Sequence, residues 1–256
     1  MEGEDHIGAL LTRYYSSLFT SANSTQLDPV LNVVETRVSS EMNDELLKPY
    51  VEAEVQLALK QMDANTAPGL DGLPPLFYKQ FWGKIGREVT KVVLSVLNIG
   101  TIPTNLNHTF ITLIPKIKSP RKVSDYRPIS LSNVLYKLIA KVLANRLKSL
   151  LPKLISETQS AFMTERLIKD NILIAHKTLH YLKEKKRTGK MGYMALKLDM
   201  SKAYDCVEWV YFERIIEKMG FSQRWINLIS MCIRSVTYSV MLNGQPHGLI
   251  TLTRGP

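Results

Sequence analysis

Two aspartates lie near the end of an apolar segment and could hold a metal ion. Asp199 closes the segment YMALKLD, whose apolar residues alternate as in a half-buried strand, and Asp205 follows shortly after. A carboxylate at a rigid strand end can bind Mg²⁺, because this cation prefers oxygen ligands and tolerates little distortion. The alternative is that Asp199 caps a turn or the next helix, as aspartates in such positions often do.

A second candidate chemistry is phosphate binding by clustered cations. From Thr112 to Lys153 the chain has ten Lys and Arg against one acid, Asp125, a balance of +9 within a net charge of +10. Such a surface attracts polyphosphates, because each neutralised phosphate releases condensed counterions. The run includes Lys116 and Arg127, whose ammonium and guanidinium groups both bind phosphate oxygens. A solvated helix face is the alternative, and composition alone leaves both open.

The composition of the whole chain is that of a packed globular protein. Its 256 residues suit one large domain or two small ones, and 45% hydrophobic with 22% charged residues argues against disorder or a collagenous chain. No apolar run approaches the roughly 20 residues of a membrane span, and the opening MEGEDHIG is acidic where a signal peptide is basic. Two cysteines are too few for a disulfide framework or a zinc pattern. We expect an intracellular protein, in nucleus or cytoplasm, without contact to a membrane.

Hydrophobic periodicity and turn residues predict the elements that position these groups. Residues 1 to about 45 mix short apolar stretches with a polar loop, and we expect a loosely attached lead-in. A basic loop between two strands predicts a two-stranded finger, and Asn243 with Gly244 predicts a tight hairpin turn. The predicted helices are 50–62, 76–82, 87–99, 132–151, 169–185, 208–219 and 223–233; the predicted strands are 108–115, 126–131, 193–199 and the two arms of a hairpin within 236–252.

Several segments occur in the order of a known family. KLDMSKAYDCVEW resembles the first catalytic aspartate element of reverse transcriptases from non-LTR retrotransposons of the long interspersed element type, in a plant-like version. The resemblance runs nearly continuously from Asn65 to Gly255, through APGLDG, LIPK, DYRPISLSNVLYKLIAKVLANRL and SETQSAFMTERLIKDNIL. It implies an α+β fold: a partial right-hand polymerase with fingers and an incomplete palm, helix-rich with a small antiparallel sheet.

The resemblance implies a role for each matched residue in nucleotide addition. Asp199 would bind the catalytic Mg²⁺ ions, assisted by the backbone carbonyl of Met200, in a reaction that uses two cations about 4 Å apart. Lys116 and Arg127 would bind the incoming dNTP. Tyr204 would be the aromatic gate against its sugar, although ordinary core packing is the alternative for a tyrosine.

Contacts to nucleic acid are implied for two further groups. Arg121 and Lys122 lie in the basic loop of the finger. Gln159, Phe162 and Arg166 belong to the template-facing element of the family, although AFMTERLI stands where the family usually has proline and glycine before the arginine. Asp71 in APGLDG has a different expected role, which is to orient a turn.

The predicted domain division follows the same resemblance. Residues 1–48 form a partly irregular lead-in, 49–190 a fingers-like region, and 191–256 an incomplete palm, a fragment that stops before the second catalytic aspartate element. After Asp205 the only acids are Glu208, Glu213 and Glu217, on a helix that leads away. A two-metal centre with one carboxylate would leave both cations under-coordinated, so we expect this chain alone to be inactive.

The predicted lineage is therefore an RNA-directed DNA polymerase of a transposable element. Such an enzyme transfers a nucleotidyl group from dNTP to a primer 3′ hydroxyl, with an RNA template and a DNA primer as partners and Mg²⁺ as cofactor. One alternative is a non-catalytic fragment that binds RNA or a heteroduplex through phosphates. Another is a pseudogene product without a function.

Overall fold

The computed structural model describes residues 2–23, 27–163, 166–188 and 194–255. The chain forms two compact units, one made of Met1–Arg146 with Tyr204–Pro256 and the other of Leu147–Ala203. The predicted division at residues 48/49 and 190/191 concerns functional regions, and it stays a prediction.

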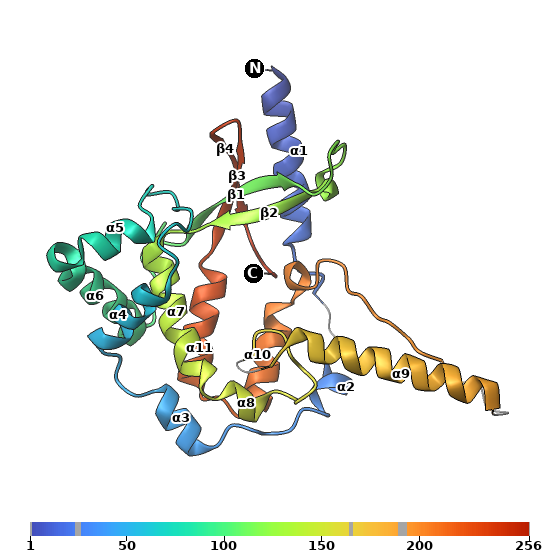
Figure 1. Cartoon of the computed structure of the whole chain (residues 1–256). Helices are drawn as coiled ribbons and strands as arrows, with labels where there is room; N and C mark the ends of the chain where they lie inside the picture. Colours follow the sequence, from blue (N-terminus) through green and yellow to red (C-terminus); the bar gives the residue numbers. More distant parts are fainter. Residues whose placement is uncertain (1, 24–26, 164–165, 189–193, 256) are drawn as a thin grey trace. The chain divides into compact units, whose positions relative to one another are not determined.

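The first unit contains most of the helices and the whole sheet (Figure 1). The helices α4, α5 and α6 pack against one another, and so do α10 and α11. The helices of this unit are α1 (Glu2–Leu18), α2 (Asp28–Leu31), α3 (Ser40–Leu46), α4 (Glu52–Gln61), α5 (Pro75–Gln80), α6 (Trp82–Ile99), α7 (Val134–Lys148), α10 (Trp209–Lys218) and α11 (Gln223–Arg234). The predicted helices of this region are thereby confirmed, with ends shifted by a few residues.

Four strands form one sheet in the order β2-β1-β3-β4. They are β1 (His108–Pro115), β2 (Tyr126–Leu131), β3 (Thr237–Leu242) and β4 (Gln245–Thr251). The pairs β1–β2 and β3–β4 are antiparallel, whereas β1 and β3 run parallel, with His108 opposite Thr237. The sheet is therefore mixed: the small antiparallel sheet that we predicted is present in the β1–β2 and β3–β4 pairs, and the parallel β1–β3 pair was not expected. Parallel neighbours need a long crossover, which the helices between β2 and β3 provide.

Helix α1 packs on the sheet instead of forming a loose lead-in. Leu11, Tyr15 and Phe19 are buried in one core with residues of β1, β3 and β4. The helix lies so close to β4 that a Cβ atom on Gly8 would be 2.4 Å from the ring of His247. The expectation of loose attachment missed this packing, because the apolar residues near the start of the chain are interrupted by polar ones and have no neighbouring helix in sequence.

Local sequence signals fix the ends of several elements, including the predicted turn at Asn243 and Gly244. Gly100 ends α6 with a left-handed φ of 81°, which glycine adopts at little cost. Ser222 caps α11, since its side chain accepts a hydrogen bond from the backbone N–H of Trp225. Asn243 and Gly244, with φ of 48° and 81°, form the tight turn between β3 and β4.

In its described residues, the second unit holds two helices and an irregular segment. The helices are α8 (Leu151–Leu154) and α9 (Ile168–Thr188), and the predicted helix 169–185 is confirmed. Residues 194–199, which we predicted as part of a strand over 193–199, have no regular structure; Tyr193 lies outside the described residues. None of the described helices combines the length and the apolar composition that crossing a bilayer requires.

Candidate functional site

The basic finger is the best-defined candidate site of the first unit. Strands β1 and β2 pair up to the positions Ile114–Arg127 and Pro115–Tyr126. Beyond Pro115 the chain forms a loop and then one short 3₁₀ turn, Val123–Asp125, before it enters β2. In Figure 1 this loop extends beyond the paired strands. The predicted two-stranded finger is confirmed.

The single acid of the finger is used to close the loop. One carboxylate oxygen of Asp125 accepts hydrogen bonds from the backbone N–H groups of Arg121 and Lys122, both at 2.9 Å. These two hydrogen bonds hold the pKa of Asp125 below its usual value. The backbone N–H of Lys116 also donates to the carbonyl oxygen of Asp125, at 2.8 Å. The loop therefore keeps its shape through contacts to its main chain, which leave the side chains of Arg121 and Lys122 exposed.

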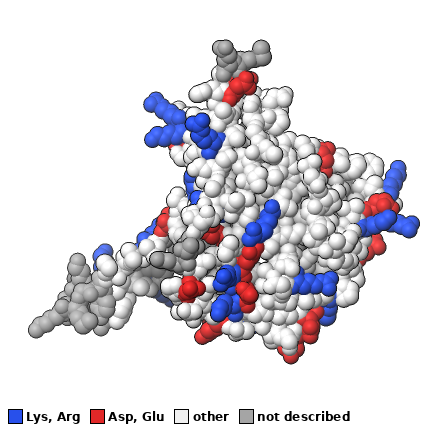
Figure 2. Space-filling view, turned by 180° about the vertical axis from the view of Figure 1, so that it is seen from behind, with Lys and Arg blue, Asp and Glu red and all other residues white. Residues whose placement is uncertain are grey.

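The finger cations that we predicted are exposed. The side chains of Arg121, Lys122 and Arg127 lie at the surface, whereas the Lys116 ammonium donates to the carbonyl oxygen of Ser124 at 3.0 Å. Lys and Arg side chains project from this part of the molecule at the upper left of Figure 2. The structure thus brings Lys116, Arg121 and Lys122 together around Asp125, with Arg127 on the adjoining strand.

Tyr204 begins a short 3₁₀ turn, Tyr204–Cys206, at the surface of the first unit. Its side chain is 69% exposed, so the alternative of core packing does not apply. The next residue, Asp205, lies near Tyr15, whose pKa rises to about 12, mainly through burial and further through the charges of Tyr14 and Asp205. Tyr204 therefore offers an accessible ring on a turn whose base adjoins the core.

A polar cluster that the sequence analysis missed holds the chain just after Tyr204. The carboxylate of Glu208 accepts hydrogen bonds from the Ser21 hydroxyl and from the backbone N–H of Ala22, and it pairs with Arg254 at 3.4 Å. Partial burial would raise the pKa of Glu208, but these hydrogen bonds lower it. Trp209 Nε1 adds a hydrogen bond to the carbonyl oxygen of Gly255 at 2.7 Å. No local pattern signals such contacts, because the partners lie far apart in sequence.

The APGLDG segment has the structural role that we expected. Asp71 accepts a hydrogen bond from the backbone N–H of Leu73 at 3.1 Å, which orients the turn. Asn133, at the start of α7, accepts from the Asp71 N–H at 3.3 Å and donates to the Leu106 carbonyl at 3.2 Å. A Cβ atom on Gly69 would lie 2.4 Å from Asn133, so this close approach requires glycine.

In the second unit, Arg166 holds the loop that precedes α9. Its guanidinium donates to the carbonyl oxygens of Ser156 at 2.6 Å and Gln159 at 2.8 Å. Gln159 in turn donates to the Ala161 carbonyl at 3.4 Å. Phe162 is 85% exposed and has a left-handed φ of 63°, which is costly for a bulky side chain. Of the predicted template-facing residues, Arg166 and Gln159 thus support the loop, and Phe162 stands out from it.

Asp199 and Met200 lie in the irregular segment of the second unit, and both side chains are exposed. The predicted strand is absent here because no described segment pairs with residues 194–200, and an unpaired strand has no partner for its backbone. Among the described residues, no three or more His, Cys, Asp or Glu side chains form a group that could hold a metal ion. A two-metal centre needs more ligands than Asp199 offers, so the described residues do not by themselves fit the Mg²⁺ ions.

Fold and site together define a helix-rich α+β protein with a basic two-stranded finger. Comparison with known protein families shows to which class of protein it belongs. A family model described as reverse transcriptase (RNA-dependent DNA polymerase) matches residues 114–255, more than half of the chain. The chain belongs to this family, whose domain is a right-hand polymerase fold. The fold class that the resemblance implied is therefore confirmed, apart from the strand directions.

Relatives among curated proteins come from transposable elements. The chain is 30% identical over 218 residues to the transposon TX1 uncharacterized 149 kDa protein of Xenopus laevis, covering 85% of this chain and 16% of that protein. It is 26% identical to a retrovirus-related Pol polyprotein from the type-1 retrotransposable element R2 of Popillia japonica, covering 81% and 28%. A type-2 element R2DM polyprotein of Drosophila melanogaster is 29% identical, covering 69% and 16%.

These relatives confirm the resemblance to non-LTR retrotransposon reverse transcriptases. The chain spans at most 28% of the length of these relatives. The plant-like character of the sequence stays a prediction.

Proposed function

We propose that the chain supplies the finger and part of the palm of an RNA-directed DNA polymerase, and that the basic finger binds the phosphates of nucleic acid and dNTP. The observation that supports this proposal most strongly is the finger itself. Its loop is closed by backbone contacts to Asp125, while the side chains of Arg121, Lys122 and Arg127 remain exposed. A surface of this kind binds polyanions strongly and with a steep dependence on salt. Family membership supports template, primer and dNTP as the proposed polyanions.

Each matched residue has a role in this proposed function. Arg127 and Lys116 hold the triphosphate of the incoming dNTP, because a planar fork and a point charge suit phosphate oxygens. The exposed ring of Tyr204 lies against the sugar. Arg121 and Lys122 contact the phosphates of template or primer. Phe162 contacts a template base, on a loop that Arg166 and Gln159 hold in shape.

Metal chemistry enters the proposal only at the level of the family, which in general depends on divalent cations. Asp199 is proposed as one ligand of such a cation, and its single exposed carboxylate does not complete a metal site. We therefore expect no primer extension by the 256-residue chain on its own. Mg²⁺-dependent dNTP incorporation by this purified chain would contradict that expectation.

Filter binding of a labelled RNA–DNA hybrid tests the role of the finger. Charge reversal at Arg121, Lys122 and Arg127 should abolish most of the affinity, because it removes the exposed cations of the loop. The matched control reverses Lys91, Lys218 and Arg224, which are exposed on other elements and give the same change in net charge. An equal loss in both triple variants would contradict a specific role of the finger, and so would an absence of affinity in the unmodified chain.

The second candidate, binding without chemistry, is favoured by the absence of a metal-ligand cluster among the described residues. In this case Asp199→Ala leaves the affinity for hybrid unchanged at all salt concentrations. The same substitution in a polymerase-competent longer protein would abolish primer extension. Retained extension there would remove Asp199 from the proposed catalytic set.

A further inference from the structure

A pocket of about 320 Å³ lies between α4, α5 and α6, outside every residue that the family resemblance assigns. It is lined by Gln56, Leu59, Lys60, Lys79 and Trp82. We propose that this pocket binds one unpaired nucleotide of a single strand, with the base on the Trp82 ring and the phosphate at Lys60. The proposal rests on the proposed function only for the class of ligand, and it uses none of the finger residues.

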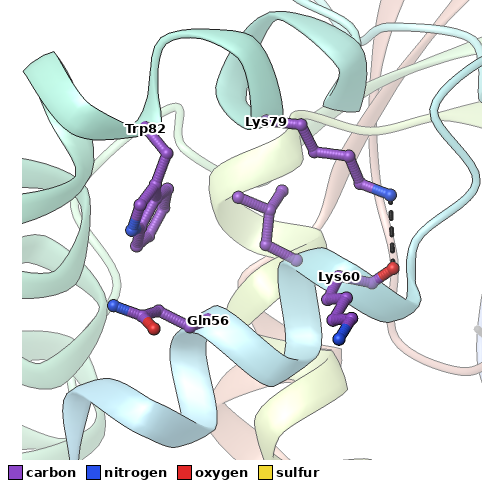
Figure 3. Close-up of a pocket in the computed structure, with 5 residues that line it drawn as sticks. Gln56, Lys60, Lys79 and Trp82 are labelled. Atoms are coloured by element: carbon purple, nitrogen blue, oxygen red, sulfur yellow. Dashed lines mark hydrogen bonds between the residues drawn. The ribbon is translucent and has the colours of Figure 1, made fainter.

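The Trp82 ring is held in place before any ligand arrives. Its indole lies against Gly86, one turn further along α6, so closely that a Cβ atom there would be 2.6 Å from the ring. One face of the ring is thus covered by the helix, and Figure 3 shows the indole turned toward Gln56 on the neighbouring α4. Trp82 is half-buried, whereas Trp209 and Trp225 are buried. A rigid, partly accessible aromatic face is the usual platform for stacking a base.

The polar edge of the pocket has a defined orientation. Gln56 Nε2 donates to the carboxylate of Glu52 at 2.9 Å, and a carboxylate can only accept, so this contact fixes which end of the amide is the oxygen. The amide oxygen of Gln56 remains able to accept a hydrogen bond. The exocyclic amino group of a base, or a ring N–H, can supply that hydrogen bond. Leu59 adds an apolar surface from the same helix.

The charge of the pocket favours an anionic ligand. None of the five lining residues is acidic, and two are lysines. The Lys79 ammonium donates to the carbonyl oxygens of Lys60 and Met62, where it caps the end of α4 (Figure 3). The Lys60 side chain is exposed at the rim, where its ammonium can reach a phosphate.

The size and shape of the pocket select a single unpaired nucleotide. Its volume lies at the lower end of the range of about 300–1,000 Å³ for small-molecule sites. A paired base in a duplex has both faces covered by its neighbours and cannot stack on a fixed indole. The three features of the pocket match three parts of one nucleotide. The flat ring of Trp82 matches the base, the amide oxygen of Gln56 matches a donor on the edge of the base, and the ammonium of Lys60 matches the phosphate.

The test measures the affinity of the whole chain for a labelled 12-nucleotide oligouridylate by fluorescence anisotropy. Trp82→Ala should weaken binding by about 5- to 100-fold, the range for the loss of one base–aromatic stack. Trp82→Phe, which keeps a flat ring, should recover most of the affinity. Gly86→Ala should weaken binding because it displaces the indole, whereas Gly83→Ala on the same helix is the matched control, since nothing lies within 4 Å of its added Cβ.

Two further readouts separate stacking from charge. Trp82→Ala should leave the slope of log affinity against log salt unchanged, whereas Lys60→Gln should reduce the slope by about 0.7, the value for one phosphate on a single strand. An abasic strand of the same length should bind the unmodified chain and Trp82→Ala equally. Oligouridylate should also quench the tryptophan emission of the unmodified chain, and this quenching should be absent in Trp82→Phe.

The outcomes distinguish the pocket from the finger. If folded Trp82→Ala binds oligouridylate as tightly as the unmodified chain, or if saturating oligouridylate leaves the tryptophan emission unchanged, the pocket proposal is overturned and a protein segment becomes the candidate occupant. Continued sensitivity to charge reversal at Arg121, Lys122 and Arg127 would then leave the proposed function standing. The reverse pattern, loss in Trp82→Ala with no effect of the finger variant, supports the pocket and contradicts the finger assignment.

Discussion

The guanidinium of Arg146, near the end of α7, lies 3.6 Å from the centre of the Tyr50 ring. The same group pairs with Glu54 at 2.7 Å and donates to the carbonyl oxygens of Leu46, Lys48 and Pro49. One side chain thus fastens α7 to the connection between α3 and α4. Because the Arg146 side chain is only 10% exposed, these contacts operate with little screening by solvent.

Replacing Arg146 should destabilise the protein strongly. In Arg146→Met the apolar stem is kept, but Glu54 and three carbonyl oxygens lose the guanidinium as a donor, although Glu54 still accepts from the backbone N–H of Val51. Removal of one partner of a buried pair typically costs about 3–5 kcal/mol. We expect a loss in this range in the free energy of unfolding, measured by urea titration. Arg146→Lys, which keeps the charge but not the fork, should lose less.

The exposed pair of Lys48 and Glu45 provides the control for that experiment. Their side chains are 61% and 57% exposed, and such pairs contribute little. Lys48→Met should therefore change the free energy of unfolding by less than about 0.5 kcal/mol. A comparable loss in both variants would show that the contacts of Arg146 do not have the proposed weight.

Glu213 should make stability depend on pH on the acidic side. Hydrogen bonds from Arg234 are the main cause that lowers the pKa of Glu213 below 4.5, with a further contribution from Ser230 and an opposing one from burial. Since the pKa is lower in the folded state, the stabilisation is present above about pH 4.5 and is lost as pH falls through the folded-state value.

Urea unfolding between pH 3 and pH 7 measures this contribution. The unmodified chain should lose stability as the solution is acidified, and Glu213→Gln should lose less over the same range because it has no carboxyl group at this position to titrate. Parallel curves for the two proteins would contradict the assignment. Glu35→Gln is a suitable control, because Glu35 is exposed and its contact with Arg37 is long, at 3.9 Å.

Features that depend on neighbouring residues were predictable from sequence, and features that depend on distant ones were not. The hairpin at Asn243 and Gly244 and the cap at Ser222 follow from local conformational preferences. The predicted strand over 193–199 is absent from its described residues, 194–199. Alternation of apolar residues indicates which face a strand would bury, but it cannot supply a pairing partner. The parallel pairing of β1 with β3, and the packing of α1 on the sheet, depend on contacts between residues far apart in sequence.

The same distinction applies to the candidate site. The basic loop of the finger was predictable because its cations are close in sequence and flanked by strand signals. The hydrogen bonds from the backbone of Arg121 and Lys122 to Asp125 were not predictable. They depend on the conformation of the loop, and the number of charges in the sequence does not determine that conformation. The pocket at Trp82 requires three helices to meet, and its one local signal is a glycine one turn after a tryptophan.

Gly69→Ala should destabilise the APGLDG turn, which packs against Ser132 and Asn133 just before α7. The added Cβ would lie 2.4 Å from the backbone nitrogen of Asn133 and 2.6 Å from the carbonyl carbon of Ser132, so the turn must move. We expect a cost of about 1–3 kcal/mol, typical of overpacking, in the free energy of unfolding. Gly83→Ala should instead stabilise by about 0.5–1 kcal/mol, since Gly83 lies within α6 with open space around it.

Phe162 combines a left-handed φ of 63° with a side chain that is 85% exposed. A bulky residue in this conformation costs of order 1 kcal/mol or more, and an exposed ring recovers little of it by packing. Phe162→Gly should therefore relieve strain, and hydrogen exchange of residues 156–163 should show equal or greater protection. If Phe162 stacks on a template base, the same variant should bind single-stranded RNA about 5- to 100-fold more weakly. A protein that keeps its RNA affinity in Phe162→Gly would remove this residue from the proposed template contacts, while loss of both protection and affinity would indicate a structural role alone.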